Sequence, residues 1–169
     1  DPEAYFRVEA RGFIHSGLFA MAISAFSPTG YLRIVRASGW YDLLITWPFA
    51  LPWTFALLYT QMGALGQALG LPGELHPLEP AHMLLANLMG SVIVVWSIAR
   101  IVEPTVLLGR LDGVARLLFS TWVIYAVVQG ANAVVLGFVL FELLFGVLQW
   151  WRVGPQGRAP VNALAPAAT

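Results

Sequence analysis

Glu142 has the surroundings that most suggest chemistry, because it lies near the middle of the apolar segment LGFVLFELLFGVLQ. An ionised carboxylate is costly in hydrocarbon, so it should be protonated, paired or facing a water-filled cavity. Asn87, Ser120, Thr121 and Tyr125 are polar side chains that other helices could bring to it. Two interpretations stay open: a structural hydrogen bond between helices, or a site for a ligand, proton or substrate.

Asp42 is the second candidate catalytic residue, although helix capping is the simpler interpretation. It lies near the start of an apolar segment, where a carboxylate can accept hydrogen bonds from free backbone N–H groups. Asp112, which precedes Gly113, is a candidate cap of a later helix for the same reason. Arg116 follows Asp112 by four residues, a spacing at which the two side chains can pair.

A charged stretch at residues 103–116 carries Glu103, Arg110, Asp112 and Arg116 between two apolar segments. We expect it to be the loop that joins two membrane-spanning helices. Arg110, Asp112 and Arg116 should then contact lipid headgroups or partner proteins rather than form a catalytic set.

Aromatic side chains deep in the apolar segments are candidates for lining a hydrophobic ligand cavity together with Glu142. They are Trp47, Trp53, Trp96, Trp122 and Tyr125. Packing alone would also explain them, and Trp40, Trp150 and Trp151 lie where interfacial anchors are expected.

No metal site and no cofactor are predicted, although an apolar cavity would suit a bound lipid or quinone. The chain has no cysteine, and Glu74, His76, Glu79 and His82 lack the helical spacing of metal ligands. A bis-histidine haem would need His15 to face His82, but the expected topology puts them toward opposite sides. Nucleotide-binding and hydrolase motifs are absent from the sequence.

The composition is that of a membrane protein. Of 169 residues, 59% are hydrophobic and only 11% are charged, whereas soluble domains carry about 25% charged residues. The formal net charge of zero disfavours nucleic acid as a partner, since phosphate binding needs clustered positive charge. The fold class should therefore be all-α, a polytopic membrane protein with a four-helix bundle.

Four spans are expected, at about residues 40–62, 81–102, 113–129 and 133–151, each long enough to cross hydrocarbon. Pro48 and Pro52 should kink the first span. Residues 1–39 are expected to form a cytoplasmic or interfacial region with a helix at about 12–26. Residues 152–169 should be a flexible tail.

The arginines predict the orientation. They precede the first span, follow the second and follow the fourth, while the two other loops have none. The excess of basic residues on the cytoplasmic side then puts both termini in the cytoplasm. Nine arginines without a lysine are typical of a GC-rich bacterial genome, so a bacterial inner membrane is expected.

The second half of the chain resembles the small four-helix membrane proteins grouped as DoxX-like. The resemblance lies in ANLMGSVIVVWSIAR, LDGVARLLF and FELLFGVLQWW, within residues 86–152. It implies a four-helix bundle and little agreed chemistry.

Two functions from different classes follow. The first is an accessory or structural subunit that packs against a larger membrane complex, which the lack of motifs favours. The second is a binder or enzyme for a hydrophobic small molecule such as a lipid, sterol or quinone, acting through Glu142 and Asp42. An enzymatic role is the less favoured interpretation, and a small transporter would require an oligomer.

Overall fold

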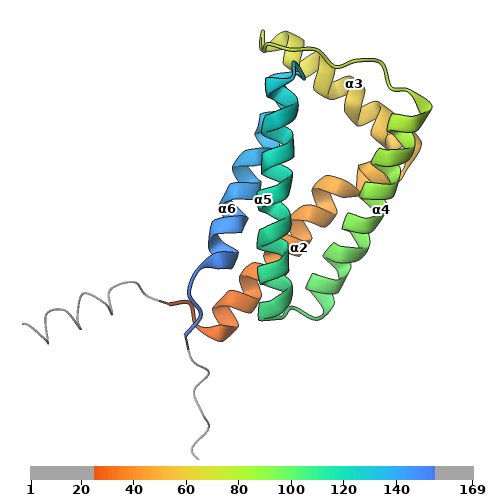
Figure 1. Cartoon of the computed structure of the whole chain (residues 1–169). Helices are drawn as coiled ribbons and strands as arrows, with labels where there is room; N and C mark the ends of the chain where they lie inside the picture. Colours follow the sequence, from red (N-terminus) through yellow and green to blue (C-terminus); the bar gives the residue numbers. More distant parts are fainter. Residues whose placement is uncertain (1–24, 155–169) are drawn as a thin grey trace, which may run out of the picture. The chain divides into compact units, whose positions relative to one another are not determined.

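The computed structural model describes residues 25–154, and over this range the fold is all-α as predicted. The contacts divide the chain into two units, of which Thr29–Trp151 is the larger. The elements are, in chain order, α2 (Pro28–Thr46), the 3₁₀ helix η1 (Trp47–Ala50), α3 (Pro52–Ala68), α4 (Pro80–Val102), α5 (Val106–Val128), the 3₁₀ helix η2 (Ala133–Val135) and α6 (Leu136–Trp150) (Figure 1).

Three helical segments are long and apolar enough to cross a membrane: Pro80–Val102, Val106–Val128 and Ala133–Trp150. The pair Pro28–Ala50 and Pro52–Ala68 would supply a fourth crossing if it counts as one bent span. The burial pattern agrees with a lipid environment. Among the described residues only four apolar side chains are buried, whereas nine polar or charged ones are, and long apolar side chains cover the outside.

The first expected span, 40–62, needs correction, because the helix is interrupted at Leu51. The segments on either side, Pro28–Ala50 and Pro52–Ala68, form a bend of 104°. Pro52 is the cause. A residue before proline is driven out of the helical region, and Leu51 accordingly has an extended backbone, with φ −123° and ψ 134°. The hydroxyl of Thr54 donates to the carbonyl of Pro48 at 2.7 Å, which satisfies an acceptor near the break.

Helix α4 packs directly on this break. Asn87 donates from its side-chain amide to the carbonyl of Phe49 at 2.8 Å. Gly90 is buried there, and a Cβ at this position would overlap the backbone of Phe49 and Ala50. The small residue at this position thus allows close contact between α4 and the broken segment.

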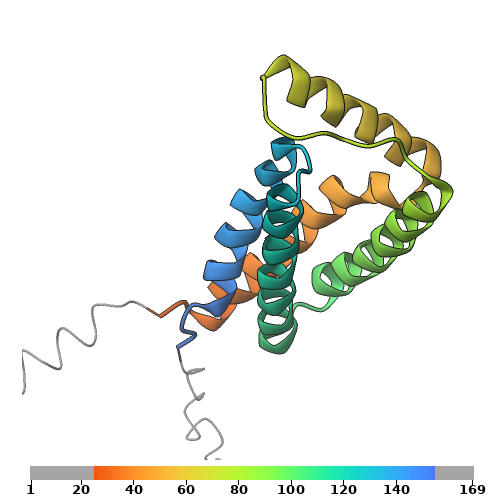
Figure 2. The same cartoon turned by 45° about the horizontal axis from the view of Figure 1, so that its top comes forward.

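Residues 129–132 make a tight turn between α5 and η2, the short helix that leads into α6. Gly130 has a φ of +101°, a conformation that suits glycine. The loop before α4 docks on this turn, since the backbone N–H of Glu74 donates to Gly130 at 3.1 Å and that of Asn132 donates to Glu74 at 3.2 Å. Figures 1 and 2 show α5 and α6 side by side, and α4 diverging from α5 with distance from the turn that joins them.

The predicted loop at 103–116 is also wrong in its extent. Only residues 103–105 connect α4 to α5. Thr105 caps α5 by accepting a hydrogen bond from the backbone N–H of Leu108 at 3.1 Å. Arg110, Asp112 and Arg116 therefore lie within a helix.

The two ends of the described chain belong to the smaller unit. There Phe26 and Val153 form an isolated parallel bridge, with the N–H of Phe26 donating to Arg152 at 2.9 Å. The interfacial helix expected at 12–26 and the tail expected at 152–169 lie almost wholly outside the described residues. Residues 28–39, expected to precede the first span, are helical and belong to α2.

Candidate functional site: a buried ion cluster

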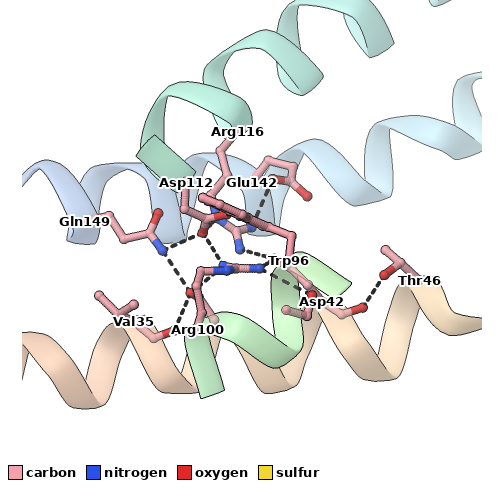
Figure 3. A network of polar contacts seen from close by, with 11 residues as sticks. Val35, Asp42, Thr46, Trp96, Arg100, Asp112, Arg116, Glu142 and Gln149 are labelled. Carbon is pink, nitrogen blue, oxygen red and sulfur yellow. Dashed lines mark hydrogen bonds and ion pairs between the residues drawn. The ribbon is translucent and has the colours of Figure 1, made fainter. Parts of the chain in front are cut away.

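Five ionisable side chains from four helices meet inside the larger unit, and we call them the ion cluster. Asp42 comes from α2, Arg100 from α4, Asp112 and Arg116 from α5, and Glu142 from α6. Figure 3 shows the two guanidinium groups between the carboxylates. The cluster takes the place of an apolar core at this point of the fold.

Arg100 is fully buried and links α4 to α2 and α5. Its Nη2 donates to Asp42 at 2.5 Å, and its Nη1 forms an ion pair with Asp112. The same Nη1 donates to the hydroxyl of Ser38 at 3.0 Å. Arg100 therefore holds two acidic side chains that come from different helices.

Arg116, with 2% of its surface exposed, contacts all three carboxylates. Its Nε donates to Asp112 at 3.0 Å, its Nη2 to Asp42 at 2.7 Å and its Nη1 to Glu142 at 2.9 Å. The predicted pairing of Asp112 with Arg116 is confirmed. Each nitrogen of this guanidinium thus faces a different acid, a multidentate geometry that suits arginine and would not suit lysine.

Asp112 accepts from four side chains. Besides the two arginines, Gln149 donates to Oδ2 at 2.7 Å and Trp96 donates from its indole N–H to Oδ1 at 3.0 Å. Gln149 also donates to Ser38 at 2.8 Å, which ties α6 to α2. A carboxylate with this many donors is a structural anchor, because its lone pairs are already engaged.

Asp42 and Glu142 are bonded less completely. Asp42 accepts both arginines at Oδ2, and Glu142 accepts Arg116 at Oε2. Within the described part of the chain no side chain donates to Oδ1 of Asp42 or to Oε1 of Glu142. Since three carboxylates face two guanidinium groups, the fully ionised cluster carries one surplus negative charge.

A cavity of about 230 Å³ lies against these two acids. Its wall combines four members of the ion cluster with apolar side chains. The lining residues are Asp42, Thr46, Met89, Val92, Ile93, Trp96, Asp112, Ala115, Arg116, Phe119 and Glu142. Met89 and Val92 are also exposed on the outside of α4, so the cavity opens at the side of the molecule between α4 and α5.

The two candidate catalytic residues, Asp42 and Glu142, are thus brought to one site, but not by the expected means. Glu142 pairs with Arg116, whereas the predicted partners Asn87 and Thr121 bond to backbone carbonyls elsewhere. Asp42 is no helix cap, because α2 begins at Pro28, well before it.

The charged residues of α5 also differ from the expectation. Asp112 does not cap α5, since Thr105 does, and Asp112 and Arg116 are 3% and 2% exposed. Burial to this degree contradicts headgroup contacts for these two residues. Arg110 is half-buried over the rings of Tyr31 and Trp150 and donates to the carbonyl of Trp151 at 2.9 Å.

Among the aromatic candidates only Trp96 lines the cavity. The other four are exposed on the outer surfaces of their helices: Trp47, Trp53, Trp122 and Tyr125. The prediction that these four line the same cavity is therefore wrong. On a membrane protein their surfaces are free to contact lipid.

Arg100, Gln149 and Ser38 belong to the site, and sequence reasoning did not find them. Arg100 lies near the end of its expected span, where an arginine is usually read as a signal of orientation. The available signal was the spacing of polar residues on single helix faces. Gln149 follows Glu142 by seven residues, and Arg100 follows Trp96 by four.

A second hollow, of about 580 Å³, lies beyond the far end of α5, between α3 and residues 74–78. Glu74, His76 and His82 are at its wall. Over residues 25–154 no group of three or more His, Asp or Glu side chains is placed to hold a metal ion.

No protein-family model, no curated protein and no solved structure matches this chain. The resemblance to DoxX-like proteins stays a prediction.

Proposed function

We propose that this protein binds a hydrophobic small molecule inside the membrane, with the polar end of that molecule in the cavity beside Asp42 and Glu142. The observation that carries the proposal is the cavity itself, whose wall combines charged members of the ion cluster with apolar side chains. Binding sites for small molecules commonly combine an apolar wall with a few placed polar groups.

The size of the cavity limits what can enter. Liquid water occupies about 30 Å³ per molecule, so 230 Å³ is room for roughly eight waters. This suits a headgroup or a single ring rather than a whole lipid. The apolar remainder of the ligand would lie along Met89, Val92 and Phe119 and leave through the opening between α4 and α5.

Binding without a chemical step is the function that the site supports best. The strongest hydrogen-bond donors at the wall, on Arg116 and Trp96, already point at carboxylates of the cluster. A group engaged in this way is poorly placed to act on a substrate as well.

The membrane arrangement belongs to the same proposal. The bent pair Pro28–Ala50 and Pro52–Ala68 would complete a set of four spans in a bacterial inner membrane, with both termini in the cytoplasm. The distribution of arginines and the spacing of the apolar helices support this arrangement.

Filling the cavity tests the proposal. Ala115 lines it, and Ala115→Phe should occupy the space beside Phe119. Ala99→Phe makes the same change at an exposed position of α4 and is the matched control. Native mass spectrometry of protein from membranes should show a bound small molecule on the wild type and on Ala99→Phe, and a loss of most of it on Ala115→Phe. A wild-type protein without any adduct, or an unchanged adduct on Ala115→Phe, would contradict the proposal.

The accessory-subunit role is the second candidate, and a groove on α5 and α6 favours it. This groove measures about 410 Å³, and its wall includes Gly113, Gly146 and Glu142 among apolar residues. It would admit an apolar helix that carries a hydrogen-bond donor. Purification in mild detergent checks it, because a protein that runs alone as a monomer would count against this role.

A further inference from the structure

Two acidic side chains at the cavity wall, Asp42 and Glu142, indicate which kind of headgroup fits there. Asp42, which is 7% exposed, lines the cavity, and within residues 25–154 no side chain donates to its Oδ1. Glu142 lines the same cavity, and no side chain of the described residues donates to its Oε1. Both acids bond to terminal nitrogens of the one Arg116 guanidinium, at 2.7 and 2.9 Å, so the two carboxylates lie within reach of a single small group.

The net charge of the ion cluster also limits which kind of headgroup can bind. Three carboxylates and two guanidinium groups leave one negative charge inside apolar surroundings, where an unbalanced charge is costly. An anionic headgroup would double this imbalance. A hydroxyl could donate one hydrogen bond but would leave the charge in place. A protonated amine supplies both the missing positive charge and up to three N–H donors.

Resting on the proposed function, we infer that the ligand is an amphiphile with a protonated amine at its polar end and an apolar chain. The amine lies between Asp42 and Glu142, and the chain passes Val92 and Phe119 to the opening. A primary amine fits the cavity better than a quaternary ammonium group, because the free oxygens are acceptors that a methylated nitrogen cannot satisfy.

Three probes with the same chain separate the contributions: decylamine, decanol and decanoate. Each is titrated into the full-length protein in lipid nanodiscs by calorimetry, with empty nanodiscs as the blank for partitioning. We expect saturable binding of decylamine at one per protein. Decanol should bind about tenfold or more weakly, because a charge-assisted hydrogen bond is replaced by a neutral one, and decanoate should not saturate.

Variants then assign the effect to the cluster. Asp42→Asn and Glu142→Gln should each weaken decylamine about tenfold to a hundredfold and change decanol less than about threefold. Glu79→Gln is the matched control, since it removes one negative charge at an exposed residue outside the cavity and should leave both affinities unchanged. Glu142→Gln is the informative variant if Asp42→Asn fails to fold.

The outcomes distinguish the inference from the proposed function. Equal, saturable binding of decanol and decylamine would overturn the inference that the headgroup is an amine, while the proposed ligand site in the cavity would remain. Undiminished decylamine binding by Glu142→Gln would also overturn it, as expected if Glu142 is held protonated for structural reasons. Absence of saturable binding by all three probes, with an empty wild-type protein in native mass spectra, would overturn both.

Discussion

Replacing Arg100 by methionine is the sharpest test of the ion cluster. Arg100 is fully buried and pairs with Asp42 and Asp112. Without it, three carboxylates share Arg116 and the surplus negative charge rises from one to two. Methionine fills similar space, so the change is mainly one of charge and hydrogen bonding.

The expected loss can be worked from this geometry. Removing one partner of a buried ion pair typically costs about 3–5 kcal/mol. Arg100 has two such pairs, but Arg116 still contacts both acids, so we expect a loss within that range and not twice it. Arg100→Met should thus lower the folding equilibrium constant by roughly a hundredfold to a few thousandfold.

The assay is reversible unfolding in mixed micelles, read by circular dichroism and by tryptophan fluorescence. Arg36→Met is the matched control, because Arg36 makes an exposed hydrogen bond to the carbonyl of Ile101 at 3.1 Å. It should cost under about 1.5 kcal/mol. The double variant Arg100→Met with Asp42→Asn should recover about 0.5–3 kcal/mol relative to the sum of the single changes. If Arg100→Met cost no more than Arg36→Met, the buried cluster would not exist in the folded protein.

Two further predictions concern the fold that holds the cluster. Gly90→Ala should destabilise the fold by more than about 1 kcal/mol, because the new Cβ meets the backbone of Phe49 and Ala50. Gly137→Ala is the control and should be neutral or stabilising, because its Cβ meets nothing within 4 Å. Equal effects of the two variants in the same unfolding assay would contradict the close packing of α4 on the break. Asn132→Ala should lower the free energy of unfolding by about 1–2 kcal/mol, since the Asn132 side chain accepts from the N–H of Val134 at 3.0 Å and donates to the carbonyl of Gly73 at 3.0 Å. A stability equal to that of the wild type would show that these hydrogen bonds do not hold the loop at 69–79 in place.

The membrane class and the approximate positions of the last three spans could be predicted from composition and hydrophobic length. Those signals depend only on neighbouring residues, and the three apolar helices of the structure lie close to the expected positions. The break at Leu51 was predicted only as a kink. Two prolines four residues apart signal a disturbance, but the angle of 104° also depends on Gly90 and Asn87 of α4, which pack against the broken backbone.

The site was predictable in part. Glu142 and Asp42 stood out because each is a lone acid among apolar residues. Arg100 and Gln149 did not, because a polar residue near a span end is usually taken to face the headgroups. Whether such a residue faces outward or inward depends on how α2 crosses α4 and α6. Contacts between residues far apart in the sequence set this crossing, such as the one between Gln149 and Ser38, which are 111 positions apart.

The distribution of the cluster over the helices also bears on how the chain enters the bilayer. Synthesis from the amino terminus delivers Asp42 first, and α4 then brings Arg100, its partner. Helix α5 carries a matched pair of its own, Asp112 and Arg116, four residues apart. Helix α6 arrives last with Glu142, after Arg116 is in place. From α4 onward, every helix of the cluster therefore meets a counter-ion within itself or among the helices already made, so only Asp42 has to wait for its partner when the helices enter the bilayer in chain order.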